Sequence, residues 1–453
     1  MYCQIQRDPL INEITNEVTT LYCQNDVSQS IRLSPEAIEY LSLPPSLRPH
    51  KGLDGRPLGI YTDNSAILAV QGFQRIRERF KLLDTARKIL IGERTQYCFF
   101  NRIDKKDGVG VMFNKLRNKA NYSNVMRCAN AWACPVCSTI ISEHRKTEVK
   151  DAIDWWKKQG GNVLLLTLTV PHYSHTDIKK LKTDLKKAYS KFFKGIRASK
   201  DMFKRWMIEH YISCFEITHG SNGFHPHYHI LLFVPYGVPQ QTLLAMRHDM
   251  YSIWCDCCTK AGLDAPSYKH GLDLQAGDKA GDYVAKWGLE HEMTKGHVKR
   301  GKENSRTPFD ILRSYQNTGN QNDANLFRLY YYAFKGQRQL NWSSGLKKKI
   351  NKKEKTDQQI VDDKDNVSET LFKLDIEMWN AVRSQGKQGE LLIAVQQDRT
   401  LKTAMDLIRQ CLSDNGMLLQ ERGGGRRNER TSEGNNMPLK KRSNNLKTMR
   451  NDK

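Results

Sequence analysis

The pattern of hydrophobic and polar positions is most regular in the middle of the chain. Apolar and alternating runs predict strands at 163–170, 211–218, 227–234 and 271–275. Apolar residues at helical spacing predict helices at 176–197, 240–261 and 276–293. The order strand, helix, strand, strand, helix, strand predicts an α+β protein with a mostly antiparallel sheet and helices on one face, the ferredoxin-like arrangement.

The rest of the chain divides by composition. A region of unknown role, with partial disorder as one interpretation, is followed by a cysteine-bearing module that ends in a helix at about 142–158. Behind the core come a helical extension, a linker, one helix candidate near 368–412 and a basic tail that has too few apolar residues to fold. The predicted divisions are 1–94 for the region of unknown role, 95–146 for the cysteine-bearing module and 147–295 for the core. The helical extension is predicted at 296–346, and the linker, helix candidate and basic tail at 347–453.

The charge balance indicates a nucleic-acid partner. The 453 residues include 72 Lys and Arg against 49 Asp and Glu, a net charge of +23 that attracts phosphate regardless of sequence. No secretory signal is recognisable, and no apolar stretch approaches the ~20 residues that span a bilayer. We therefore expect a cytoplasmic protein without a membrane partner. The eleven cysteines are then expected to be reduced, which favours metal ligands or core packing over disulfides.

The segment HPHYHILLFV, residues 225–234, carries the strongest chemical signal. Residues two apart in a strand share a face, so His227 and His229 can bind one hard metal ion together. If the hairpin is symmetrical about its 219–224 loop, Glu216 lies opposite His227 and supplies an oxygen ligand. His225 is the competing ligand, because it has the same parity but lies opposite Thr218. Mg²⁺ or Mn²⁺ is the expected catalytic ion.

The cysteine-bearing module contains the pattern C-x5-C-x2-C, formed by Cys128, Cys134 and Cys137. Cys-Pro-x-Cys is a tight thiolate turn, and four such ligands in a tetrahedron suit Zn²⁺. The fourth ligand is either Cys98 or His144. A closed four-ligand site would be structural. The remaining cysteines of the core, Cys255, Cys257 and Cys258, lack a partner pair at ligand spacing and are interpreted as core thiols.

Four blocks in one order extend these observations beyond single motifs. They are RCANAWACPVCSTIISEHR, FEITHGSNGFHPHYHILLF, YVAKWGLEHEMTKGHVKRG with TPFDIL, and GQRQLNWSSGL. Together with a Thr-bearing strand (Thr167, Thr169) and a Tyr-x-x-Lys helix, they resemble HUH-type rolling-circle replication initiators with a single tyrosine, from plasmids and phages. The resemblance covers roughly residues 95–346. Relatives with a similar upstream cysteine favour Cys98 as the fourth zinc ligand.

The resemblance implies the chemistry. Tyr283 would attack one strand of origin DNA, leaving a 5′-phosphotyrosine and a 3′-OH, with Lys286 holding the phosphate or the phenolate. Single-stranded and origin DNA, a host helicase and a host polymerase are the implied partners. Thr167 and Thr169 are expected to support the sheet beneath the site. Some relatives carry a water-activating Glu where this chain has Lys279. Release of the DNA strand from Tyr283 would then need water activated by a nearby carboxylate, with Asp278 preferred to Asp282, or attack by the Tyr283 of a second protomer.

Two other interpretations stay open. A conjugative relaxase or single-strand transposase shares the histidine pair and the tyrosine, although the WACPVC and LNWSSGL blocks favour the initiator. A zinc-containing DNA-binding regulator without catalysis would need the charge and the cysteines, but not the histidine pair. The origin sequence, the plasmid or phage source and the oligomeric state do not follow from these residues.

Overall fold

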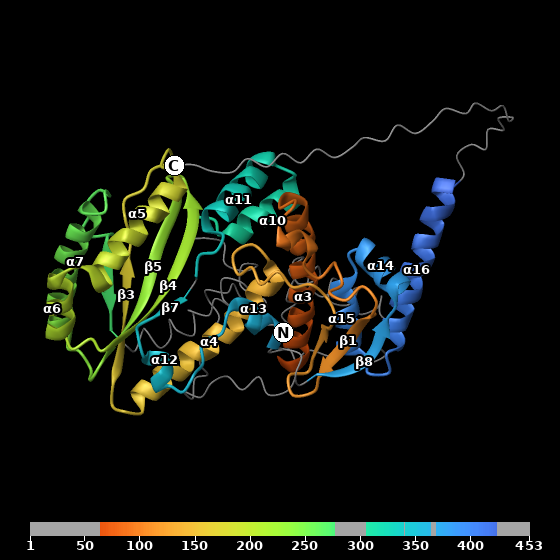
Figure 1. Ribbon diagram of the computed structural model, residues 1–453, viewed down its shortest axis with the longest axis horizontal. Coiled ribbons are helices and arrows are strands. Elements are labelled where there is room, and N and C mark those ends of the chain that lie inside the picture. The colour runs from red at the N-terminus through yellow and green to blue at the C-terminus, as the bar shows by residue number, and fades with distance from the viewer. Residues whose placement is uncertain (1–63, 277–304, 339, 364–367, 424–453) are drawn as a thin grey trace, which may run out of the picture.

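The computed structural model describes residues 64–276, 305–338, 340–363 and 368–423. Two antiparallel sheets organise these residues, one of five strands and one of three. Figure 1 shows helix α4 (Pro135–Lys157) running between the region of the smaller sheet and the larger sheet. The protein is therefore α+β with antiparallel sheets, as the pattern predicts at that level. None of the described helices is long and apolar enough to cross a membrane.

The five-stranded sheet has the order β6-β3-β5-β4-β7, and every neighbouring pair is antiparallel. The strands are β3 (Asn162–Leu168), β4 (His210–Gly220), β5 (Gly223–Val234), β6 (Leu272–Gln275) and β7 (Leu340–Trp342). The four predicted strands are present, and β4 and β5 extend further into the hairpin than the apolar pattern indicates. The polar ends of both strands pair through backbone hydrogen bonds up to Gly220 and Gly223.

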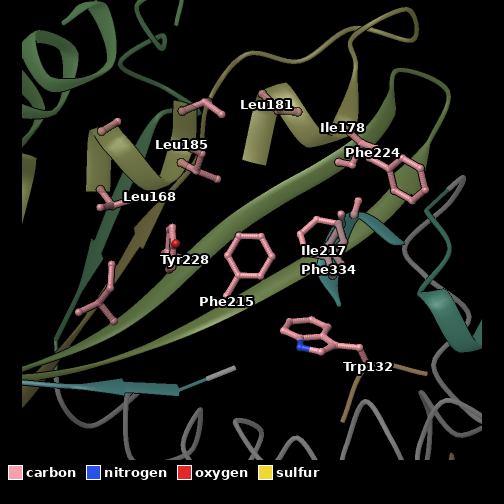
Figure 2. Packing of buried hydrophobic residues seen from close by; sticks show 14 of the residues in the cluster. Trp132, Leu168, Ile178, Leu181, Leu185, Phe215, Ile217, Phe224, Tyr228 and Phe334 are labelled. Atoms are coloured by element: carbon pink, nitrogen blue, oxygen red, sulfur yellow. The ribbon is translucent and has the colours of Figure 1, made fainter. Parts of the chain in front are cut away.

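The two faces of this sheet are covered by different helices, because side chains alternate between the faces of a strand. Leu164, Leu166 and Ile230 share one buried cluster with helices α5 (Ile178–Ser190) and α7 (Gln240–Thr259). Figure 2 shows Leu181 and Leu185 of α5 above the aromatic side chains of Phe215 and Tyr228. On the opposite face, Val163, Leu165 and Phe233 pack with Ile153 and Trp156 of α4.

The helix predicted at 176–197 is shorter and is followed by two further elements. After α5 the chain forms a π-helical turn, η2 (Lys191–Gly195), and then helix α6 (Arg197–Arg205). Phe192 and Phe193 are adjacent and both are buried. A regular helix turns successive residues by about 100°, so the wider π turn allows both rings to face the core. The pattern of inward residues alone did not indicate this break.

The smaller sheet has the order β2-β1-β8, with β1 (Val109–Asn114), β2 (Lys119–Tyr122) and β8 (Glu369–Leu374). Around it pack α3 (Asn64–Ile89), the short η1 (Arg94–Tyr97), α14 (Ile376–Ser384), α15 (Gln388–Gln397) and α16 (Lys402–Gly423). The single helix expected near 368–412 is thus a strand and three helices. Strand β8 is mostly half-exposed, and its partner β1 lies some 250 residues earlier, so local periodicity carries little sign of it.

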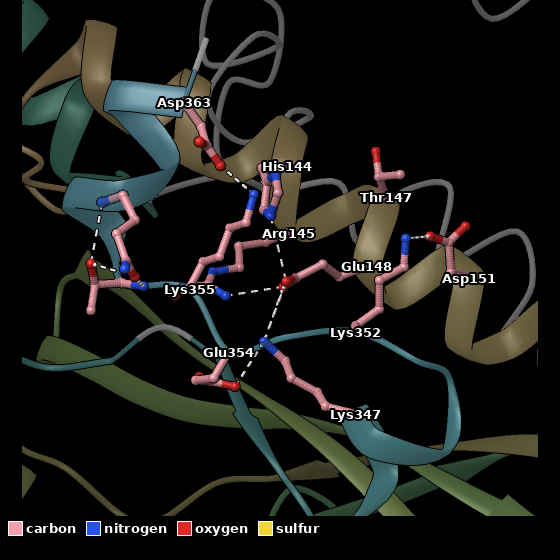
Figure 3. Close-up of polar contacts among 12 residues, drawn as sticks. His144, Arg145, Thr147, Glu148, Asp151, Lys347, Lys352, Glu354, Lys355 and Asp363 are labelled. Carbon is pink, nitrogen blue, oxygen red and sulfur yellow. Dashed lines mark hydrogen bonds and ion pairs between the residues drawn. The ribbon is translucent and has the colours of Figure 1, made fainter. Parts of the chain in front are cut away.

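The segment expected to be a linker contains helices α12 (Leu346–Lys349) and α13 (Asp357–Asp362) and is bound to α4. Figure 3 shows buried Glu148 of α4 between Arg145, at 3.0 Å, and Lys347, at 3.3 Å. Arg145 also bonds Asp357 at 3.1 Å. Burial opposes ionisation of Glu148, but His144, Arg145 and Lys347 outweigh it and lower its pKa to about 2.

The part of the helical extension that the structure describes consists of two helices joined by a tight loop. Helices α10 (Pro308–Thr318) and α11 (Gln321–Phe334) form a hairpin whose first helix has a capping box between Thr307 and Asp310. Phe334 of α11 packs against Phe215 of β4 and Trp132 of the cysteine module. This contact joins the helical extension to the end of the larger sheet.

Candidate functional site

The β4–β5 hairpin aligns the acidic and histidine candidates. Its register pairs Glu216 with His227 and Thr218 with His225, as the predicted hairpin symmetry requires. The turn is tight because Gly220 pairs with Gly223, whose φ of +87° is readily adopted only by glycine. Glu216, His227 and His229 lie on the face of the sheet that α4 covers further along the strands.

The three side chains converge on one point. The Nε2 atoms of His227 and His229 each lie 3.2 Å from Oε2 of Glu216. The exposed fraction is 19% for the Glu216 side chain and 12–13% for the two imidazoles, so the cluster is sheltered but remains open on one side. Burial opposes ionisation of Glu216, but the imidazoles of His229 and His227 hold its pKa well below the usual range.

Both imidazoles are oriented through their second nitrogen. His229 Nδ1 lies 3.0 Å from the hydroxyl of Thr167, and His227 Nδ1 lies 3.3 Å from the carbonyl oxygen of His225. These contacts point both Nε2 atoms toward the carboxylate, the arrangement in which outer partners orient metal-ligating histidines. A mixed set of one oxygen and two nitrogens fits a divalent ion that keeps further positions for water or substrate.

Other predicted residues lie outside this convergence. His225 is not part of the group of ligand atoms, and its ring instead contacts His172, with 4.4 Å between centroids. Burial, followed by the neighbouring imidazoles, lowers the pKa of His225 to about 3. Thr169 donates to the carbonyl of His270 and thus fastens β3 to the segment before β6. Tyr283, Lys286, Asp278 and Asp282 lie outside the described residues.

The loop after β3 brings exposed aromatic side chains to the hairpin that the sequence pattern did not predict. Tyr173, 50% exposed, stacks on the exposed His175 with 5.7 Å between centroids and 8° between planes. The loop packs against the hairpin turn, since a Cβ at Gly223 would lie 3.2 Å from the Tyr173 carbonyl. His172 connects it to His225. The signal available in the sequence was the aromatic composition of PHYSH directly after a strand.

A second cluster contains the four predicted cysteines. The Sγ of Cys98 lies 3.5 Å from that of Cys137 and 3.7 Å from that of Cys134, and Cys128 lies 3.9 Å from Cys137. All four are buried. These separations are far too long for disulfides. In a tetrahedral zinc site with bonds of about 2.3 Å, neighbouring sulfurs are about 3.8 Å apart, so the cluster fits that geometry.

Helix α4 positions two of these cysteines. Cys134 caps its first turn, and its sulfur accepts the backbone N–H of Cys137. His144, the alternative fourth ligand, lies further along α4 with its Nε2 3.5 Å from Glu148 and is not part of the cysteine cluster. Cys257 and Cys258 are buried core residues of α7, as expected for core thiols, whereas Cys255 on the same helix is only half-buried.

The fold and the two clusters define an α+β protein with two separate sets of side chains that could bind metal ions. The sequence model of a family described as "Replication protein" matches residues 119–386. This is more than half of the chain, which therefore belongs to the replication protein family.

Two curated relatives share part of the sequence. "Protein rep" of Streptomyces lividans is 26% identical over 296 residues, which cover 50% of this chain and 64% of the relative. "Protein rep" of Lentilactobacillus hilgardii is 29% identical over 153 residues, 31% of this chain and 47% of the relative. The chain thus spans less than two thirds of the length of either relative. No solved structure matches significantly.

Proposed function

We propose that this protein initiates rolling-circle replication of a plasmid by nicking one strand of the origin, as HUH endonucleases do. The observation that carries the proposal is the convergence of Glu216, His227 and His229 at 3.2 Å on a sheet of a replication protein. A protein that only bound DNA would have no need of this open set of ligands. The sheet order β6-β3-β5-β4 also agrees with the ferredoxin-like arrangement expected for that class.

The chemistry assigned to the site is a phosphoryl transfer to Tyr283. Its phenolic oxygen forms a bond to the scissile phosphorus while the bond from phosphorus to the 3′ oxygen breaks. The leaving 3′ oxygen takes up a proton in place of the one that the phenol loses. A divalent ion held by the cluster would polarise the phosphate. Lys286 would compensate charge on the phenolate, whose pKa is ordinarily about 10.

The stacked pair Tyr173 and His175 supports a single-stranded substrate at this site. Exposed aromatic faces bind unpaired bases by stacking, at about 1–3 kcal/mol per base. His172 precedes the pair in the same loop and contacts His225, two residues before His227, so the loop lies along the strand that carries the cluster. We assign it to a base close to the scissile phosphate, with the free 3′-OH passing to a host polymerase and the duplex to a host helicase.

The second cluster is assigned a structural role. Four buried thiols with tetrahedral spacing leave no open position for substrate, so zinc there would stabilise the fold of the cysteine module. The same arrangement is compatible with a zinc-containing regulator. That alternative predicts no strand cleavage at all.

The decisive experiment uses labelled single-stranded oligonucleotides that tile the plasmid origin. With Mg²⁺ or Mn²⁺, the wild-type chain should form an adduct whose mass is that of the protein plus the 5′-phosphorylated fragment. EDTA and Tyr283→Phe should each abolish the adduct, whereas Tyr268→Phe should retain it. Wild-type protein that binds the origin without forming an adduct would favour the regulator, and an adduct formed by Tyr283→Phe would move the nucleophile elsewhere.

A relaxase or transposase would also form this adduct. The initiator is distinguished by a plasmid test in cells. A plasmid whose replication depends on this gene should be lost with Tyr283→Phe, even when the variant is expressed at the wild-type level.

A further inference from the structure

The outer surface of α5, η2 and α6 is strongly basic and lies apart from the two clusters. Residues 178–205 carry eleven Lys and Arg against two Asp, a net charge of +9 out of +23 for the whole chain. Nine of the eleven cations are exposed. The apolar side chains of the same segment face the sheet, so this surface is the polar side of the helical layer.

Most of this charge is not compensated locally. Asp184 pairs with Lys180 and Lys187, Asp201 with Arg197, and Asp249 with Arg205. The other exposed lysines of the segment form no ion pair within the described part of the chain. They are Lys179, Lys186, Lys194, Lys200 and Lys204. Lys179 and Lys186 are two turns apart and lie on one stripe of α5, about 10 Å apart along the axis.

The surface has no ring for stacking on bases. Tyr189 is stacked on Tyr228, and its hydroxyl bonds Ser213 at 2.7 Å. Trp206 donates to Asp249, and none of the large exposed hydrophobic residues of the described chain falls in 178–205. Proteins that bind single strands combine positive charge with aromatic platforms, whereas lysines alone contact the closely spaced phosphates of a duplex.

We propose that this lysine surface, formed by α5, η2 and α6, binds the sugar-phosphate backbone of double-stranded DNA without regard to sequence. It lies on the face of the sheet opposite to Glu216, His227 and His229, so a duplex held there would not compete with the strand at the cluster. The chain would hold double-stranded DNA beside the origin while the single strand is cut. The inference rests on the proposed function only in taking DNA as the ligand.

The test is a titration of the full-length chain with a short duplex of random sequence and with oligo(dT), at several salt concentrations. The variant combines Lys179→Gln, Lys186→Gln, Lys194→Gln and Lys200→Gln. Log K falls with log salt, and each lost phosphate contact reduces the magnitude of this negative slope by about 0.9. The slope for the duplex should therefore become less steep by about 3 to 4. Affinity for the duplex should drop by more than about tenfold, with little change for oligo(dT).

A matched control removes the same charge elsewhere. Lys88, Lys105, Lys106 and Lys402 are exposed lysines around the smaller sheet, and the corresponding four glutamine substitutions should leave the duplex slope near that of the wild type. Equal slopes for the two quadruple variants would overturn the proposal. An equal loss for duplex and oligo(dT) would overturn the duplex assignment.

The binding measurement does not depend on cleavage. It is made without divalent metal and repeated with Tyr283→Phe, so failure of the nicking proposal would leave the duplex titration unchanged. Failure of the lysine surface would in turn leave adduct formation on a short single-stranded oligonucleotide intact. Thermal unfolding is measured for both quadruple variants as the control that they fold.

Discussion

The two clusters differ in composition and in burial. The cysteine cluster has four side chains of one kind, all buried, and belongs to the core of the smaller sheet. The Glu216 cluster has three side chains of two kinds, each 12–19% exposed, on strands β4 and β5. A fully buried set of ligands is typical of a metal site that stabilises the fold, whereas a catalytic metal site keeps a position open for substrate. Helix α4 connects them, since it begins at Cys134 and ends against Phe233 of the larger sheet.

The largest effect should come from opening the closed cluster. Cys134→Ser removes a thiolate ligand, while serine can still cap α4, so the protein should release about one zinc per chain and the cysteine module should unfold. Elemental analysis and hydrogen exchange measure both. Cys411→Ser changes another buried thiol of the same core and should retain the metal. A wild-type chain that contains no zinc would contradict the structural role assigned to the cysteine cluster.

The next effect concerns the open cluster. His227→Ala should lower adduct formation by about 10³-fold, because a metal that polarises phosphate is worth several kcal/mol. Binding of the oligonucleotide should change far less, since basic contacts elsewhere supply the affinity. His219→Ala changes a histidine of the same hairpin outside the cluster and should keep activity. Global unfolding by His227→Ala would mean that both clusters are structural.

A third prediction tests the connection made by α4. The folded pKa of Glu148 is about 2, below its ordinary 4.5, so its stabilising contribution is present above pH 4.5 and is lost as the pH falls toward 2. The difference corresponds to about 3 kcal/mol. Urea unfolding at a series of acid pH values should therefore show a weaker acid loss for Glu148→Gln than for the wild type.

The control for that measurement is Glu143→Gln on the same helix. Glu143 is more exposed and has only a 3.8 Å contact with Lys119, so this variant should follow the wild-type acid loss. Parallel curves for all three proteins would show that the network of Glu148, Arg145 and Lys347 does not stabilise the folded chain.

The smallest effect should come from the support of the open cluster. Thr167→Val keeps the shape of the side chain but removes the hydroxyl that contacts His229 at 3.0 Å. Loss of such an outer partner typically costs about 10- to 100-fold in metal affinity or activity, and we expect the lower end. Thr169→Val, whose hydroxyl bonds His270 instead, should stay near the wild type. Metal titration of adduct formation distinguishes the two.

Sequence patterns predicted those features that depend on near neighbours. The hairpin has a short turn, so its symmetry correctly predicted the pairing of Glu216 with His227. The Cys-Pro-x-Cys turn correctly indicated that cysteines gather there. The contact of His172 with His225 could not be predicted, because it depends on how the loop after β3 folds back over the hairpin. The roles of Tyr283 and Lys286 stay predictions.

The sequence by itself determined the four strands of the larger sheet's core, the helix at 240–259, the parity of the histidines and the basic charge, because alternation and helical spacing are local properties. The resemblance favoured Cys98 over His144, and the tertiary structure places Cys98 in the cysteine cluster. Only the tertiary structure paired β8 with β1 and brought Lys347 to Glu148 across about 200 residues of chain. These contacts form between segments far apart in the chain, and packing of the whole core selects them from many partners of similar local pattern.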